Sequence, residues 1–174
     1  MKAAMAWLDG LQPELARIAD ARHDDPHALL GAHMRGGRLT VLTFLPAVTH
    51  AWLPGGRALT RLPGTDFFSW EGPPGDLPEH YPVDWTDSDG AVQTQIDPYS
   101  FAPTVSADDL WNFGEGNHVT AWRFLGAHPM QVAGIDGTRF AVWAPNAERV
   151  SVVGPFCAWD GRRLPLRRLG AGGV

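Results

Sequence analysis

An internal repeat constrains the fold of this chain more than any other feature of the sequence. Residues 30–33 read Leu-Gly-Ala-His, and the same four residues return at 125–128. Both copies precede a stretch that is rich in β-branched and aromatic residues. The chain is therefore expected to contain two versions of one structural unit.

The similarity continues downstream of each Leu-Gly-Ala-His element. A constant offset of 99 residues aligns 38–53 with 137–152 without a gap, and Phe44 is then matched by Trp143. Each copy reads as a strand, a proline turn and a second strand. Between the two alignments the offset changes by four residues, which we attribute to one connecting loop of different length.

Glycine and proline punctuate the chain, with 20 Gly and 15 Pro among 174 residues. Short apolar runs between Pro-Gly and Gly-Gly turn signals are typical of a β-sandwich. These runs predict strands at 39–45, 48–53, 67–70 and 81–85, and then at 138–144 and 149–153 around a turn at 145–147.

The predicted fold class is mainly β, with two tandem immunoglobulin-like β-sandwich modules, the second incomplete, and a short N-terminal helix. Leu11, Leu15 and Ile18 recur at helical spacing, and the helix is expected to end before Pro26. We expect a first module at 1–103, a linker at 104–121, where no clear period is visible, and a second module at 122–174.

A sandwich of this type needs roughly 100 residues to close two sheets over a core. Residues 122–174 are too few, so we expect the second module to lack its later strands and to leave apolar faces uncovered. Poor protection or aggregation is predicted for the C-terminal half, and uniformly slow amide exchange from 138 to 169 in a monomer would contradict this.

Charge and composition exclude several classes of protein. Nineteen acidic residues against fourteen basic ones give a net charge of −5, and no basic run is long enough for nucleic acid. Only six apolar residues separate Lys2 from Asp9, too few for a signal-peptide core, and no stretch is apolar enough to span a membrane. A single cysteine, Cys157, fits a reducing cytoplasm.

Several motifs resemble a known family. Asp25 to His33 resembles the opening of bacterial glycogen (1,4-α-glucan) branching enzymes of the α-amylase superfamily, and Gln95 to Phe101 resembles the end of their first module. Gly116 to His118 is similar to the joint between their modules. Gly137 to Ala147 is similar to the start of their second, carbohydrate-binding-type module.

The resemblance implies a parent enzyme that cleaves an α-1,4 linkage, holds the glucan covalently and transfers it to a 6-hydroxyl. This chemistry needs two carboxylates on a catalytic barrel, whose motifs do not occur in this sequence. We therefore expect no catalytic residue, no cofactor and no metal, and a chain that is inactive alone. The implied partners are α-1,4-glucan (glycogen) and the absent barrel, with no nucleic acid and no membrane.

The sequence pattern expected for a glucan contact is an exposed aromatic residue with hydrogen-bonding side chains beside it. Trp159, beside Asp160 and Arg162, fits this pattern best, and Trp143 is a further candidate on a sheet surface. For both tryptophans the alternative is packing, against the sandwich or the barrel. Cys157 departs from the Asn that is usual in this family, which weakens a sugar-contact role for this turn.

Other polar and aromatic residues have simpler interpretations. Three tryptophans in predicted strands are expected in the core: Trp52, Trp70 and Trp85. The acids Asp97, Asp108 and Asp109 are expected to be solvated or to cap turns. A metal site among His23, His27, His33, Asp24 and Asp25 is disfavoured, because Pro26 breaks the helix that would align the first two histidines.

Two other functions were considered. One is a stand-alone glycogen-binding module, which would need a complete second sandwich. The other is the accessory region of a debranching enzyme or a maltosyltransferase, against which the doubled module argues.

Overall fold

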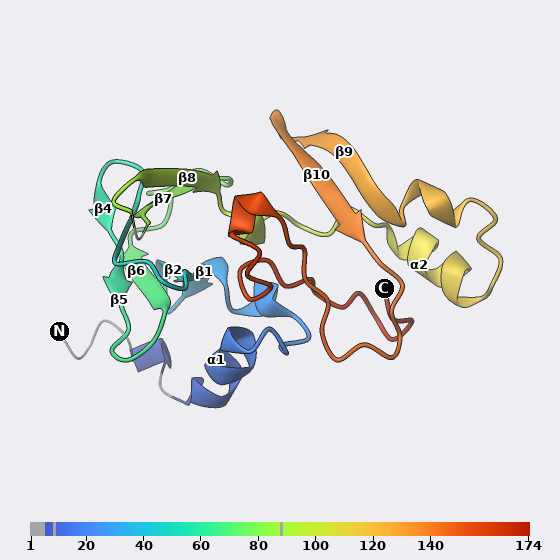
Figure 1. Ribbon diagram of the computed structural model, residues 1–174, viewed down its shortest axis with the longest axis horizontal. Coiled ribbons are helices and arrows are strands. Elements are labelled where there is room, and N and C mark those ends of the chain that lie inside the picture. Colours follow the sequence, from blue (N-terminus) through green and yellow to red (C-terminus); the bar gives the residue numbers. More distant parts are fainter. Residues whose placement is uncertain (1–5, 9, 88) are drawn as a thin grey trace.

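The computed structural model describes residues 6–8, 10–87 and 89–174. Most of the apolar start that argues against a signal peptide, residues 1–5 and 9, therefore lies outside the described residues. The helices and strands follow one another along two β units, drawn from blue to red in Figure 1. In chain order they are η1 (Ala6–Leu8), α1 (Gln12–Ala19), η2 (Pro26–Ala28), β1 (Gly31–Arg35), β2 (Arg38–Phe44), β3 (His50–Leu53), β4 (Arg57–Ala58), β5 (Thr60–Arg61), β6 (Phe67–Gly72), β7 (Pro82–Thr86), β8 (Val92–Ile96), η3 (Pro98–Ser100), α2 (Ala107–Gly114), η4 (Ala121–Arg123), β9 (Gly126–Val132), β10 (Ile135–Ala141) and η5 (Pro155–Cys157).

The first module is a sandwich of two antiparallel sheets, in the orders β1-β2-β6-β5 and β4-β3-β7-β8. Alternate residues of each strand point into the space between the sheets, as the period of a strand requires. Val41 of β2, Phe68 of β6 and Tyr81 just before β7 are all almost inaccessible there. The predicted mainly-β sandwich is confirmed for this module.

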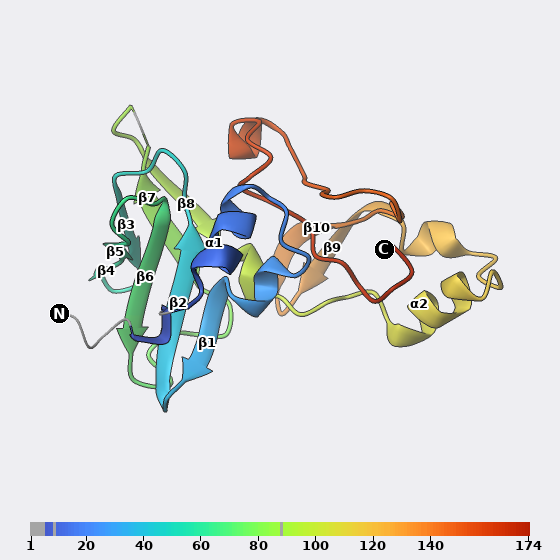
Figure 2. The same ribbon diagram turned by 90° about the horizontal axis from the view of Figure 1, so that it is seen from below.

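Helix α1 adds a third layer on the outer face of the β1-β2-β6-β5 sheet (Figure 2). Leu15 and Ile18 of α1 pack against Leu42 and Phe44, the β2 residues that point away from the sandwich interior. Strand β2 is therefore buried on both faces. The helix predicted from its apolar spacing is confirmed, and it ends well before Pro26.

The internal repeat is visible as two hairpins with matching registers. Gly31 pairs with Leu42 in β1–β2, and Gly126 pairs with Ala141 in β9–β10, at the offsets found in the sequence. The four additional residues of the second copy do not lengthen a loop. They add two residues to the paired part of each strand, which gives seven residue pairs in β9–β10 against five in β1–β2, and a two-residue turn closes each hairpin.

The same local contact precedes both hairpins. His33 Nε2 lies 3.0 Å from the Leu30 carbonyl oxygen, and His128 Nε2 lies 2.8 Å from that of Leu125. A short 3-10 helix comes before each of them, η2 in the first copy and η4 in the second. The Leu-Gly-Ala-His element is therefore a structural motif that leads the chain into a hairpin.

The second module has less regular structure than the first. Its two-stranded β9–β10 sheet is accompanied by α2, and Leu110 and Phe113 of that helix pack near the buried Phe124 and Ala141. The strand predicted at 149–153 is present only as a bridge between Ser151 and Pro165, with two flanking backbone hydrogen bonds.

The stretch 104–121, expected to be a linker without clear periodicity, contains α2. Ser106 caps this helix by accepting a hydrogen bond from the Asp109 N–H at 3.0 Å, and Asp108 and Asp109 occupy its first turn. The domain boundaries themselves remain a prediction.

Three of the predicted core residues can be placed. Trp85 is buried in the sandwich, whereas Trp52 and Trp70 are only partly buried. Trp70 packs against the edge of the core cluster.

Candidate functional site

The turn that carries Trp159 is a compact series of backbone hydrogen bonds after η5. The N–H groups of Cys157 and Trp159 both donate to the Gly154 carbonyl oxygen, at 3.1 and 3.0 Å. Ala158 and Trp159 adopt left-handed conformations with φ of 53° and 59°. Such conformations cost non-glycine residues roughly 1–2 kcal/mol each, so this turn needs support from its surroundings.

Cys157 forms the buried floor of the turn. It is almost inaccessible, and its sulfur accepts a hydrogen bond from the Gly154 N–H at 3.3 Å. The buried Cys157 side chain therefore stabilises the turn through its contact with the Gly154 backbone. A direct contact with a ligand is not its role in this arrangement.

The Trp159 side chain itself projects from the turn and is 68% exposed. The expectation that it packs in its own sandwich is therefore wrong, because most of the ring lies in solvent. Contact with a ligand and contact with another part of a larger protein both stay open for this residue.

Asp160 and Arg162 lie beside Trp159 and bind each other. Arg162 Nη2 donates to Asp160 Oδ2 at 2.7 Å, and Arg162 Nε donates to Oδ1 at 3.0 Å. The hydrogen bonds from Arg162 lower the pKa of the Asp160 carboxyl below its usual value. The charged hydrogen bonds hold the two side chains against each other on the same turn that exposes Trp159.

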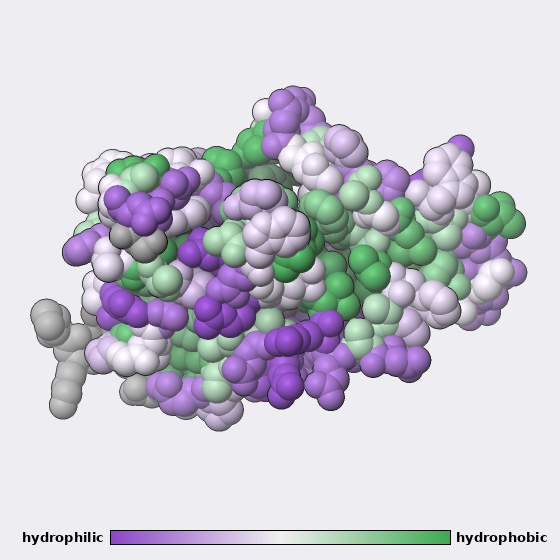
Figure 3. Space-filling view, viewed as in Figure 1, coloured by the Kyte–Doolittle hydropathy of each residue, from purple (hydrophilic) through white to green (hydrophobic). Residues whose placement is uncertain are grey.

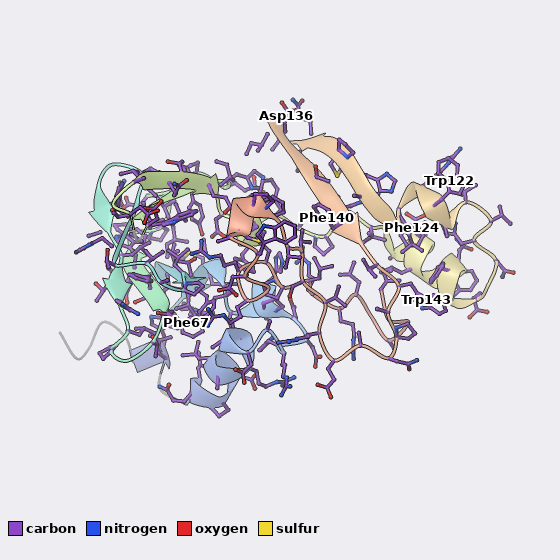
Figure 4. The ribbon with its side chains drawn as sticks, in the orientation of Figure 1. Phe67, Trp122, Phe124, Asp136, Phe140 and Trp143 are labelled. Atoms are coloured by element: carbon purple, nitrogen blue, oxygen red, sulfur yellow. The ribbon has the colours of Figure 1, made fainter. Side chains whose placement is uncertain are left out.

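Trp143 lies elsewhere in the second module. Its ring meets Phe113 of α2 edge-on at 5.7 Å, and its Nε1 donates to the Gly172 carbonyl oxygen at 3.0 Å (Figure 4). In Figures 1 and 2, α2 lies at the far end of the molecule from the first module, whereas η5 approaches that module. The structure thus brings Trp159, Asp160 and Arg162 together and separates Trp143 from them.

The histidines near α1 point to different partners. His23 Nε2 lies 2.9 Å from Glu14 Oε2, whereas His27 meets the Tyr99 ring edge-on at 4.9 Å. Within residues 6–8, 10–87 and 89–174, no group of three or more His, Cys, Asp or Glu side chains is placed to hold a metal ion.

Asp97 is a buried acid that caps a turn. One of its oxygens accepts a hydrogen bond from the Tyr99 N–H at 3.0 Å, and the other accepts one from the Tyr81 hydroxyl at 2.5 Å. Burial raises the pKa of Asp97 to about 6, although these hydrogen bonds act in the opposite direction. The turn-capping interpretation is confirmed, while the solvated one is wrong for this acid.

A cavity of about 880 Å³ lies between the modules. Gln93 and Gln95 of β8 line it from the first module, and Met130, Ile135 and Phe140 line it from the second. Figure 3 shows hydrophobic surface collected around this region and over the second module. Large apolar side chains exposed in the second half of the chain include Trp111, Trp122, Phe140, Val142, Trp143, Phe156 and Trp159.

Comparison with known proteins decides the family. Residues 11–99 match the family described as "alpha-1,4-glucan branching enzyme GlgB, N-terminal domain", and this match covers half of the chain. The chain belongs to the GlgB N-terminal domain family.

The remainder of the chain matches a second family. Residues 124–174 match carbohydrate-binding module 48, described as an isoamylase N-terminal domain. The first match contains the first copy of the repeat, and the second match contains the second copy. The GlgB-type chain is therefore a tandem of β modules, the second of a carbohydrate-binding family.

Curated relatives carry the same family name. The 1,4-alpha-glucan branching enzyme GlgB of Methylococcus capsulatus is 49% identical over 165 residues, which are 94% of this chain and 22% of the relative. The Cellvibrio japonicus enzyme is 44% identical over 94% of this chain and 24% of its own length, and the Streptomyces coelicolor enzyme GlgB 1 is 43% identical over 91% and 20%.

The chain thus spans about a fifth of the length of the relatives that it matches. The matched part corresponds to the N-terminal, non-catalytic region of a GlgB branching enzyme. No helix in the described residues has the length and apolarity needed to cross a membrane.

Sequence reasoning missed the residues that join the GlgB modules. Arg163 Nη2 donates to the Pro46 carbonyl oxygen at 2.8 Å, and the Tyr99 hydroxyl lies 3.4 Å from the Arg163 carbonyl oxygen. In the sequence, Arg163 is only the second residue of an Arg-Arg pair, and Tyr99 lies within the Gln95 to Phe101 motif that resembles the end of a module. Neither signal identifies a partner so distant in the sequence.

Proposed function

We propose that the chain is the glucan-contacting, non-catalytic part of a glycogen branching enzyme. The parent reaction cleaves an α-1,4 linkage and transfers the released segment to a 6-hydroxyl. The second module offers the Trp159 turn to α-glucan outside the active centre. Holding a long chain in this way raises its effective concentration at the catalytic site.

One observation carries this proposal. Trp159 presents an exposed aromatic face beside the fixed Asp160–Arg162 pair, in a segment that matches a carbohydrate-binding family. The apolar face of a pyranose ring stacks on an indole, while its hydroxyl groups need directional donors and acceptors at the edge. Trp143 is a weaker candidate, because its indole N–H is already bonded to Gly172.

Affinity electrophoresis in gels that contain glycogen tests the proposal. We expect the wild-type chain to be retarded and Trp159→Ala to lose most of this retardation, while both stay folded by circular dichroism. Trp122→Ala is the matched control, because Trp122 is as exposed as Trp159 but lies on η4. Unretarded migration of the folded wild type, or equal retardation of wild type and Trp159→Ala, would contradict the proposal.

The same proposal assigns the apolar surface around Phe140 and Val142 to packing on the catalytic barrel of the parent enzyme. Its support is the exposure of both side chains, of which Phe140 lies in β10 and Val142 directly follows that strand, on either side of the buried Ala141. Gel filtration of this chain with a separately produced barrel from the Methylococcus capsulatus enzyme should give a joint peak. Separate elution of the two folded proteins would count against this partner.

A cytoplasmic location is part of the proposal. Its support is the single buried cysteine, Cys157, which leaves the chain without an internal disulfide. Recovery of the protein in the soluble cytoplasmic fraction of producing cells is expected, and secretion would contradict it.

A further inference from the structure

The Trp159 turn rests on the first module at both of its ends. Before the turn, Phe156 and Cys157 line a small cavity of about 40 Å³ that they share with Trp85 and Gln95 of the first sandwich. After the turn, Arg163 reaches across to Pro46 through the hydrogen bond described above. The five residues between these points, 158–162, contain every proposed glucan contact except Trp143.

The contact after the turn is reciprocal. The guanidinium group of Arg163 donates to the first module, and the Arg163 carbonyl oxygen faces the hydroxyl group of Tyr99. Tyr99 is itself fixed, because its N–H donates to Asp97 and its ring meets His27. A hydrogen bond from a charged donor is roughly twice as strong as a neutral one, so Arg163 is the strongest single link at this point.

The contact continues along the chain. Arg167 Nη2 donates to the Phe101 carbonyl oxygen at 2.9 Å, and the Arg168 N–H donates to the Asp24 carbonyl oxygen at 2.8 Å. The segment after the Trp159 turn is thus bound to the first module at three successive points.

These contacts explain how an unfavourable turn is maintained. Two consecutive non-glycine residues, Ala158 and Trp159, are left-handed, and such conformations persist only where the surrounding structure fixes them. Within the described part of the second module, the segments that flank the turn form no strand and pair through the Ser151–Pro165 bridge and two neighbouring backbone hydrogen bonds. The first module supplies much of the remaining support.

We propose that the first module positions the Trp159 turn for glucan, with Arg163 as the positioning residue and Pro46 and Tyr99 as its anchors. This inference rests on the proposed function of the turn. It gives the first module a direct part in glucan binding by the second, although none of its own side chains touches the sugar.

The test is Arg163→Met in the full chain, which removes the donors but keeps most of the apolar stem. We expect at least a threefold loss of glycogen affinity in the electrophoresis assay. Arg168→Met is the matched control from the same segment, because its side chain bonds only to Ala147 of the second module and its link to the first is through the backbone. Tyr99→Phe removes one hydroxyl group and should give a smaller loss in the same direction.

A second readout separates positioning from general loss of structure. In ¹⁵N-tryptophan spectra, the indole resonance of Trp159, assigned by its disappearance in Trp159→Phe, should shift or broaden in Arg163→Met. The Trp70 resonance, assigned in the same way, should stay in place, because Trp70 packs against the first core and lines neither of the two cavities described above. Arg168→Met should leave both unchanged.

The outcomes distinguish this inference from the proposed function. If Trp159→Ala weakens binding while Arg163→Met changes neither affinity nor the Trp159 resonance, positioning by the first module is wrong and the glucan site stands. If Trp159→Ala has no effect on binding, the glucan site is wrong, and the indole resonance still decides whether Arg163 orders the turn. A simultaneous change of the Trp70 resonance in Arg163→Met would identify general loss of structure and overturn the positioning role.

Discussion

At the scale of single residues, two titratable groups line the junction between the modules, the partly buried His27 and the fully buried Asp97. Burial, assisted by the nearby Arg167 charge, lowers the pKa of His27 from 6.5 to about 4. Burial raises the pKa of Asp97 from 3.8 to about 6. Tyr99 contacts both, through its ring and its N–H. Over the range from about pH 4 to 6, the contributions of His27 and Asp97 to stability therefore change in opposite directions.

The sign of each effect follows from linkage between protonation and folding. His27 is neutral in the folded state, so its contribution to stability is present above pH 6.5 and is lost as the pH falls towards 4. Asp97 stays protonated in the folded state up to about pH 6, whereas in the unfolded state it ionises at about pH 3.8. Its contribution to stability is therefore fully present below pH 3.8 and is lost as the pH rises through about 6.

We predict opposite pH responses for variants at these two positions. Relative to wild type, Asp97→Asn should gain unfolding free energy as the pH rises from below 3.8 to above 6, by roughly 3 kcal/mol over the whole range. His27→Gln should gain relative to wild type as the pH falls from 6.5 to 4. Urea unfolding of the three proteins at half-unit pH steps measures this. Curves that stay parallel to wild type would show that neither group titrates as described.

At the scale of elements, the two hairpins allow a controlled comparison of one glycine in two settings. Gly31 and Gly126 begin β1 and β9 with φ of 91° and 106°, values that disfavour any side chain. A Cβ on Gly31 would lie 3.0 Å from Tyr99 Cβ and 3.1 Å from the Tyr99 carbonyl oxygen. A Cβ on Gly126 would meet only His128 Nε2, at 3.7 Å.

We therefore predict that Gly31→Ala costs more than Gly126→Ala. Backbone strain lowers the unfolding free energy of both variants by an amount on the order of 1–2 kcal/mol. Only the Gly31→Ala side chain also overpacks against Tyr99, which lowers it by a further amount of roughly 1–3 kcal/mol. Urea titrations followed by resolved NMR peaks report the loss in each module separately. Equal losses at the two positions would show that the approach of Tyr99 to β1 does not matter energetically.

The sequence predicts those elements whose pattern is local. The apolar spacing of α1 and the runs that form β2, β3, β6 and β7 are recovered. Strands β1 and β9 were not predicted, so the repeat was found in the sequence without the two hairpins that it forms, and its change of offset was wrongly attributed to a loop. Strand β8, which reads Val-Gln-Thr-Gln-Ile, was missed because its glutamines hide any apolar alternation. Helix α2 was missed although Ser106, three residues before Asp109, is a recognisable cap.

The residues that sequence reasoning placed wrongly depend on distant partners. Residues 149–153 have the apolar content of a strand, but a strand needs a paired neighbour, and only Ser151 finds one in a bridge. Trp159 could be placed in a turn beside Asp160 and Arg162. Its support from Arg163 and Pro46 spans most of the chain, and no local pattern encodes such a contact.

At the scale of the whole molecule, equivalent positions of the repeat have opposite environments. Phe44 is 5% exposed, whereas its counterpart Trp143 is 56% exposed, and Val41 and Phe140 differ in the same way. Strand β2 is covered by the second sheet on one face and by α1 on the other. Strand β10 pairs only with β9 and has few buried neighbours.

Protection against amide hydrogen exchange should follow this difference. We predict that amides hydrogen-bonded within β2 exchange only through global unfolding of the first module, whereas those within β10 exchange at least 100-fold faster through local opening. Counted from the Gly31–Leu42 and Gly126–Ala141 pairs, residues 38–42 of β2 match residues 137–141 of β10, so each of these five β2 amides has a matched β10 amide as its control. Sedimentation must show a monomer, because self-association over the exposed apolar residues would also slow exchange. Equal, slow exchange of 38–42 and 137–141 in a monomer would mean that the β9–β10 hairpin is as stable as the first sandwich, and that burial does not set the stability of the two copies.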